Sequence, residues 1–245
     1  MSAKDPNRIP VFDYRTLRLL IGIIAFALPF TVLLLAGDLV GDDGEKTGLG
    51  SISAGYHTDA HDAFVGMLFI VGAFLLAYRG HDIYQSAWSK VAAMCAWIVA
   101  IFPTKCRFAE SMCEYPKYLD TFGDASVLAK IHFCAAVTLF IILACFAFWP
   151  FRSAVKGKTG PRRIRSGIYM LCAFAMAASV IAVSIVTGFR DGDMAHKLGV
   201  TFWGELVALV AFGIAWIVAG KALPPLQDPD HGDDPPLFGP STKTE

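Results

Sequence analysis

The run Leu19–Gly37, LLIGIIAFALPFTVLLLAG, contains no charged residue. As a helix it would be about 30 Å long, which is enough to cross a bilayer. Its single proline, Pro29, fits this interpretation because membrane helices accept proline better than soluble helices do. The run therefore predicts a membrane-spanning helix that is retained in the protein and is not a cleaved signal peptide.

The composition extends this prediction to the whole chain. Of 245 residues, 55% are hydrophobic and only 17% are charged, against about 25% charged in a soluble domain. The formal net charge is zero, so nothing indicates nucleic-acid binding. Five more apolar runs predict further spans at 63–78, 91–104, 127–151, 167–189 and 198–220.

We therefore expect an all-α polytopic membrane protein with a six-transmembrane-helix bundle. Residues 19–220 would form the bundle, between a cytoplasmic segment, 1–18, and a disordered cytoplasmic tail, 221–245. The tail is rich in proline and aspartate and shows no hydrophobic periodicity, which is typical of disorder.

Basic residues predict the orientation, because cytoplasmic loops carry an excess of lysine and arginine. With both termini inside, the outer side receives only seven of the 21 basic residues, namely Lys46, Lys105, Arg107, Lys117, Lys130, Arg190 and Lys197. This predicts an N-in/C-in topology, in the inner (cytoplasmic) membrane if the protein is bacterial.

The stretch Gly50–Phe64, GSISAGYHTDAHDAF, is the densest cluster of reactive side chains. If the second helix begins near Ser53, then Ser53, His57 and His61 fall on one face. Two histidines four residues apart can chelate one metal ion, and His132 and His196, which open the fourth and sixth spans, could complete the site. The alternative is that these polar residues cap a helix, with Asp62 favourable in its first turn.

Glu205 is a carboxylate within the sixth span. Such residues usually face the bundle interior, a cavity or a partner, because a charge in lipid is costly. One interpretation is a neutral, hydrogen-bonded acid or an ion pair with Lys130 or Lys197. The other is a functional group, with Glu205 or Asp62 as general base and Ser53 positioning a substrate.

The six cysteines divide into two groups. Cys106 and Cys113 lie in a loop that we place outside, where an oxidising compartment favours a disulfide. The others lie inside predicted spans, where cysteine acts as a small apolar residue.

Several motifs resemble an uncharacterised bacterial family of six-span membrane proteins: SISAGYH at 51–57, DAFVG at 62–66, FPT at 102–104, IHF at 131–133 and AFGIAW at 211–216. This resemblance covers most of the chain and implies a fold but no activity. Gly55 and His61 depart from that family's pattern.

A partial resemblance is to the alkaline ceramidase and adiponectin-receptor superfamily of membrane-embedded zinc hydrolases. In those proteins a serine precedes a histidine by four residues, as Ser53 precedes His57 here. They have seven spans and a His-x-x-x-His pair in the last one, where this chain offers only His196 and Glu205.

These observations lead to three functional hypotheses. The first is a zinc-dependent hydrolase in the outer half of the bilayer that acts on a lipid amide or ester. The second is a non-catalytic accessory or scaffold subunit that binds a membrane-protein partner. The third is a haem-binding membrane protein with two axial histidines, for which His57 and His132 could qualify.

Overall fold

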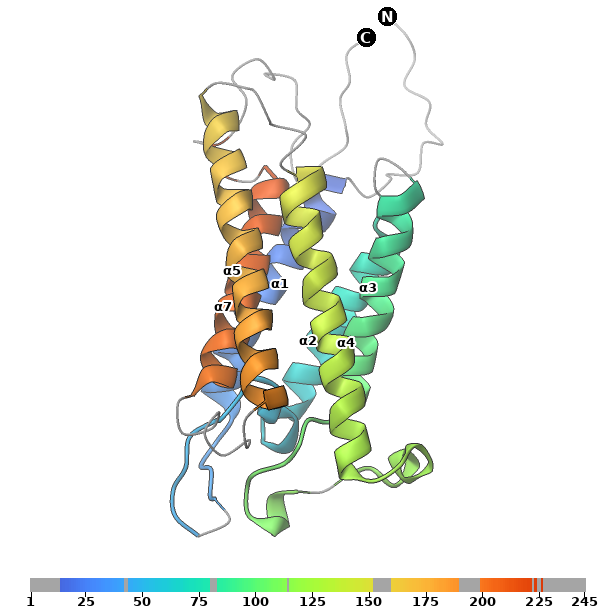
Figure 1. The fold of residues 1–245 in the computed structure, drawn as a ribbon, viewed down its shortest axis with the longest axis vertical. Helices are drawn as coiled ribbons and strands as arrows, with labels where there is room; N and C mark the ends of the chain where they lie inside the picture. Colours follow the sequence, from blue (N-terminus) through green and yellow to red (C-terminus); the bar gives the residue numbers. More distant parts are fainter. Residues whose placement is uncertain are drawn as a thin grey trace, which may run out of the picture.

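The structure, a computed structural model, describes residues 14–41, 44–79, 83–113, 115–151, 160–189, 199–221, 223 and 226. These residues form an all-helical architecture (Figure 1). Its long helices are α1 (Tyr14–Leu35), α2 (His61–Ala77), α3 (Ile83–Ile101), α4 (Ala125–Phe146), α5 (Pro161–Phe189) and α7 (Val200–Ala219). A π-helical turn, Ala147–Phe151, extends α4.

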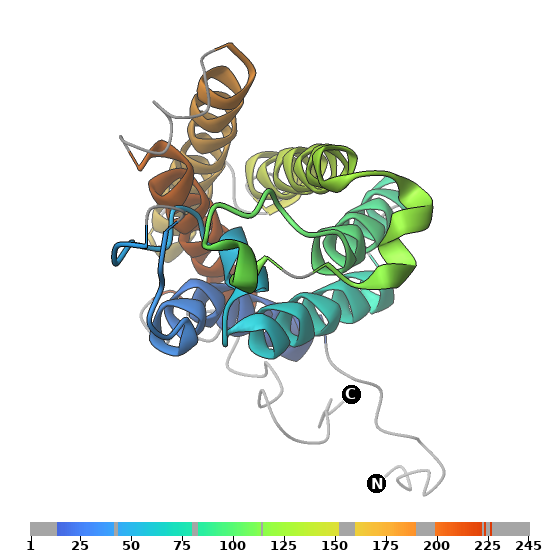
Figure 2. The ribbon, with the colours of Figure 1, turned by 90° about the horizontal axis from the view of Figure 1, so that it is seen from below.

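The helices are arranged in a ring. Each packs against the next in the chain, and α7 closes the ring by packing against α1, as Figure 2 shows from below. Arg15, in the first turn of α1, donates a hydrogen bond of 3.3 Å to the carbonyl of Lys221 just after α7. The ring therefore begins and ends at the same end of the molecule.

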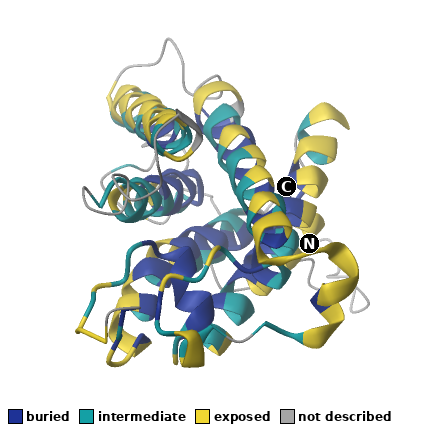
Figure 3. Ribbon diagram, turned by 60° about the horizontal axis from the view of Figure 1, so that its bottom comes forward, coloured by how far each residue is buried: buried dark blue, intermediate teal, exposed yellow. Residues whose placement is uncertain are grey.

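Among the described residues, four helices are long and apolar enough to cross a membrane: 15–35, 125–149, 161–187 and 200–219. Helix α2 is also apolar but has only 17 residues. The outward faces carry large apolar side chains such as Leu34, Leu171 and Phe174, which are 83%, 71% and 60% exposed. Buried residues line the inward faces (Figure 3). This pattern, with apolar side chains on both the inside and the outside, suggests a membrane protein.

Helices α3 and α5 show the largest shifts, since they begin eight and six residues before the spans that hydropathy predicts. Helix α3 begins at Ile83, eight residues before the predicted span, and ends at Ile101. Helix α5 begins at Pro161, so Arg162, Arg163 and Arg165 lie in its first turns and not in a link. Proline is favoured in the first turn of a helix, which explains this start.

Glycines set the closest helix contacts. A Cβ on Gly22 of α1 would lie 2.6 Å from the backbone nitrogen of Ile217 in α7. A Cβ on Gly213 of α7 would lie 2.8 Å from the backbone nitrogen of Phe26 in α1. The two helices can approach this closely only because neither residue has a side chain. Gly72 of α2 likewise leaves room for the Trp97 ring of α3. A Cβ on Gly66 would instead meet open space.

Two loops cover the lower end of the ring (Figures 1 and 2). The first follows α1 and contains a 3₁₀ helix, η1 (Ser53–His57), whose residues are all buried. The second follows α3 and carries the disulfide. The amide of Ala109 donates a hydrogen bond of 3.0 Å to the Val40 carbonyl, and a small apolar cluster, Ala36, Leu39, Ala54 and Phe108, joins the two loops.

Candidate functional site

The Glu205 carboxylate accepts two hydrogen bonds from Ser53. Its Oε2 accepts a hydrogen bond of 2.9 Å from the Ser53 amide, and its Oε1 accepts one of 2.8 Å from the Ser53 hydroxyl. The carboxylate thus caps the start of η1, where the backbone amides of a helix lack internal partners. Glu205 is therefore hydrogen-bonded, and the ion pair with Lys130 is not formed. No other cation among the described residues forms a salt bridge with Glu205.

The hydrogen bonds continue from Glu205 into the loop. The hydroxyls of Ser51 and Ser53 are 3.2 Å apart, and the amide of Ala54 donates to the Ser51 hydroxyl at 3.0 Å. Because the Ser53 hydrogen points to Glu205, Ser51 is the donor to Ser53. The result is a chain of donors that runs from the backbone through two hydroxyls to one carboxylate.

Two buried histidines from different elements donate hydrogen bonds to the same short segment after α3. His57 Nε2 donates a hydrogen bond of 2.9 Å to the Thr104 carbonyl, and His132 Nδ1 donates one of 2.6 Å to the Phe102 carbonyl. Pro103 lies between these residues and has no amide hydrogen, so α3 cannot continue through it. The carbonyls at the helix end need donors from elsewhere, and the histidines supply them.

The environment of His57 keeps its ring neutral. Burial, opposed by the Thr104 hydrogen bond, lowers the pKa of His57 below its ordinary value. Its Nδ1 is buried and has no hydrogen-bond partner among the described residues, so a proton there would find no acceptor. The rings of Tyr56 and Tyr115 both pack edge-on against it, with centroids 5.3 Å away.

A cavity of about 160 Å³ lies inside the ring next to Glu205. All six long helices or the segments adjoining them contribute to its wall. Most of the wall is apolar, as at Leu28, Phe64 and Leu139. Its polar lining residues are Ser53, Thr104, His132, Ser179, Thr187, Thr201 and Glu205.

The structure brings together some of the residues predicted for a site and separates others. Ser53, His132 and Glu205 line the cavity. Helix α2 begins at His61 and not near Ser53, so Ser53, His57 and His61 do not share a helix face. His61 Nδ1 donates to the Tyr56 carbonyl at 2.7 Å, and Asp62 is exposed in the first turn of α2. His196 lies outside the described residues.

A zinc site needs three or four ligating side chains around one point. Within the part of the chain that the structure describes, no three His, Cys, Asp or Glu side chains lie close enough to hold a metal ion. His57, His61 and His132 each use one ring nitrogen for a backbone carbonyl. Among the described residues, the predicted ligands therefore do not come together as a group of three. Zinc binding with His196, and haem binding, stay predictions.

Cys106 and Cys113 form a disulfide, as predicted from the sequence. The bridge closes a short loop that packs against the site, since the Cys106 amide donates a hydrogen bond of 3.3 Å to the Tyr115 hydroxyl. Tyr115 in turn contacts His57.

Some residues of the site were not predicted from the sequence. Phe102 and Thr104 take part through their backbone carbonyls. The signal available for the carbonyls was Pro103, because a proline at a helix end leaves acceptors that buried donors must satisfy.

Comparison of the chain with protein-family models, with curated proteins and with solved structures finds no match.

Proposed function

We propose that the chain crosses the membrane six times, with both termini in the cytoplasm. Successive helices alternate in direction around the ring (Figure 1). Helix α2 would be about 25 Å long, slightly less than the roughly 30 Å hydrocarbon core, a mismatch that a bilayer accommodates by local thinning. Arg162, Arg163 and Arg165 then face the cytoplasm at the start of α5, in accord with the positive-inside rule.

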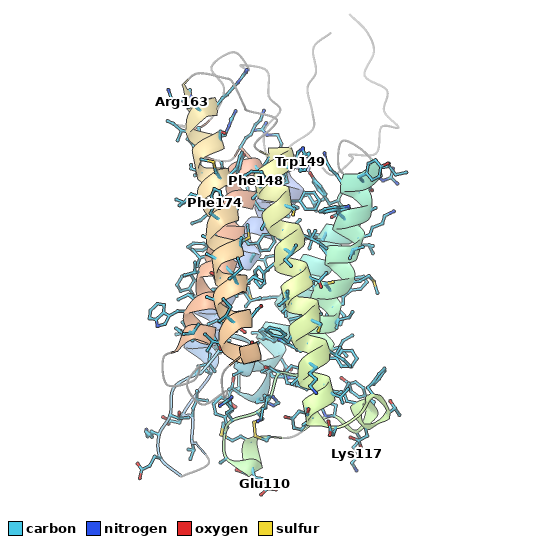
Figure 4. All side chains as sticks on the ribbon, in the orientation of Figure 1. Glu110, Lys117, Phe148, Trp149, Arg163 and Phe174 are labelled. Carbon is cyan, nitrogen blue, oxygen red and sulfur yellow. A yellow bond between two sulfur atoms is a disulfide. The ribbon has the colours of Figure 1, made fainter. Side chains whose placement is uncertain are left out.

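Aromatic side chains support this placement. Phe148 and Trp149 follow α4 near its upper end, and Phe174 lies opposite Phe148 on α5 (Figure 4). They are 42%, 75% and 60% exposed. Trp149 is therefore an exposed tryptophan near a helix end, which is typical of the membrane–water interface.

Cysteine labelling tests the orientation. Lys117 and Arg163 lie at opposite ends of the molecule (Figure 4), and both are exposed. In a Cys134→Ser background, a membrane-impermeant maleimide should label Lys117→Cys in intact cells. It should label Arg163→Cys only after permeabilisation, and the reverse pattern would refute N-in/C-in.

Within this topology, the function that we propose is the binding of an amphiphilic ligand inside the ring. The observation that carries it is the cavity beside Glu205, which is lined by segments of the whole ring. Ligand sites in proteins are typically mostly apolar, with a few polar groups that orient the ligand. This cavity has that character, and an apolar cavity of similar volume in another protein binds benzene. An alkyl chain from the bilayer would suit it.

The binding of a neutral probe tests this function. Protein in nanodiscs should bind n-octyl glucoside at one saturable site above the partitioning into empty nanodiscs. Ala136→Phe, which places a ring in the cavity, should abolish that binding. Ile141→Phe is the matched control on the same helix, because Ile141 is 50% exposed on the outside. Equal binding by both variants would refute the proposal.

A lipid ester or amide hydrolase is the second candidate, and one contact favours it. The Ser53 hydroxyl donates a hydrogen bond of 2.8 Å to the Glu205 carboxylate on the cavity wall. This is the distance expected between a nucleophilic hydroxyl and its general base. Hydrolysis of p-nitrophenyl octanoate by the purified protein would support this candidate only if both Ser53→Ala and Glu205→Gln lose it. Turnover by either variant at the rate of the wild-type protein would eliminate the hydrolase candidate.

A further inference from the structure

A second, larger chamber lies at the lower end of the ring. Its volume is about 440 Å³, within the range of small-molecule sites. Its wall comes from the two outer loops, from the first turns of α4 and from the adjoining ends of α5 and α7. Three cationic residues, Lys105, Arg107 and Lys130, contribute to this wall, and all three are exposed. No carboxylate belongs to the wall as far as the structure describes it.

The outer chamber adjoins the cavity of the ring. Thr104, Phe133, Thr187 and Thr201 line both spaces. The character of the wall changes along this path. Cations and hydroxyls such as Thr47 and Ser51 contribute to the wall of the outer chamber, whereas large apolar side chains such as Leu28, Leu68 and Phe140 line the inner cavity.

We propose that the two spaces together bind a single-chain amphiphile with an anionic head group. The head group occupies the outer chamber, where Lys105 and Lys130 neutralise its charge. The alkyl chain passes the shared threonines into the inner cavity. This inference rests on the proposed amphiphile-binding function and adds the charge of the ligand.

The wall also argues against a cationic head group. Glu205 is the one carboxylate among the described residues that line the inner cavity, and it already accepts two hydrogen bonds from Ser53. A cation would lose its hydration in a chamber walled by three positive charges. An anion gains attraction from these charges at the outer surface, and that attraction must weaken with salt.

Three probes with the same octyl chain test the charge: n-octyl phosphate, n-octyl phosphocholine and n-octyl glucoside. In nanodiscs at low salt, octyl phosphate should bind at least about tenfold more tightly than the other two. The double variant Lys105→Gln/Lys130→Gln should remove about tenfold of the octyl phosphate affinity and leave octyl glucoside unchanged. The matched control is Lys46→Gln/Lys117→Gln, which removes two lysines at the same end that do not line the chamber.

The outcomes separate this inference from the function on which it rests. Equal affinity for the three probes, all lost in Ala136→Phe, would overturn the anionic head group and leave amphiphile binding intact. Binding of none of them above background would overturn the function itself. Inorganic phosphate should compete poorly with octyl phosphate; competition at equal concentration would mean that the chamber binds a free anion, and would also overturn the inference.

Discussion

The Glu205 carboxylate of the last helix accepts both the amide and the hydroxyl hydrogen of Ser53, which lies 152 residues earlier in the chain. One side chain therefore fixes the start of η1 to α7. Each oxygen of the carboxylate accepts one hydrogen bond, one from the backbone amide and one from the hydroxyl.

This pair should be energetically coupled. We expect Glu205→Gln to lower the free energy of unfolding by about 1–3 kcal/mol. The NH₂ group of Gln cannot accept the hydrogen bond that one Glu205 oxygen accepts from Ser53. Ser53→Ala should cost about 0.5–1.5 kcal/mol, since the backbone hydrogen bond survives. Chemical denaturation of the single and double variants in detergent measures the coupling, which should be at least about 0.5 kcal/mol.

The control for this cycle is Asp62→Asn. Asp62 is an exposed carboxylate in the first turn of α2, so its loss should cost less than about 1 kcal/mol through the helix dipole. Additive effects of Glu205→Gln and Ser53→Ala would show that the pair does not stabilise the fold.

The glycines of the helix contacts give a second prediction. Gly22→Ala should destabilise the protein by about 1–3 kcal/mol, because its Cβ would meet the backbone of Ile217 at 2.6 Å and push α1 away from α7. Gly66→Ala is the matched control, with no atom within 4 Å. It should be neutral or stabilise by up to about 1 kcal/mol through helix propensity. Thermal unfolding in the same detergent compares them, and equal effects would contradict the packing.

The sequence predicts the helical architecture better than it predicts the site. Uncharged runs such as Leu19–Gly37 reveal a membrane helix because lipid imposes length and apolarity on it. The partner of Glu205 was not predictable, since hydropathy does not indicate which loop turns back into the ring. Ser53 appeared to belong to the start of α2, whereas the chain forms a separate 3₁₀ helix and begins α2 at His61.

The disulfide should contribute stability locally. Cys106→Ser/Cys113→Ser should lower the free energy of unfolding by about 2 kcal/mol, because the bridge restricts the unfolded chain over a short loop. Reductant should destabilise the wild-type protein and leave the double variant unchanged. Cys134→Ser, which changes an exposed free cysteine, is the control and should keep the response to reductant. A wild-type protein that is indifferent to reductant would contradict the prediction.

The buried neutral ring of His57 predicts a dependence of stability on pH. Burial lowers the pKa of His57 in the folded protein below its ordinary value of 6.5. As the pH falls through about 6.5, the unfolded chain takes up a proton at this residue and the folded protein does not, so stability is lost on the acid side. The loss from one such group is at most about 1.4 kcal/mol per pH unit.

The variant His57→Gln isolates this contribution. Its amide can donate to the Thr104 carbonyl in place of Nε2, and it does not titrate. The free energy of unfolding, measured from pH 7.5 to 5, should therefore fall less steeply in His57→Gln than in the wild-type protein. Groups common to both proteins cancel in the difference between the two curves. Parallel curves would show that His57 takes up its proton equally in the folded and unfolded states, and that the contacts around its ring do not keep it neutral.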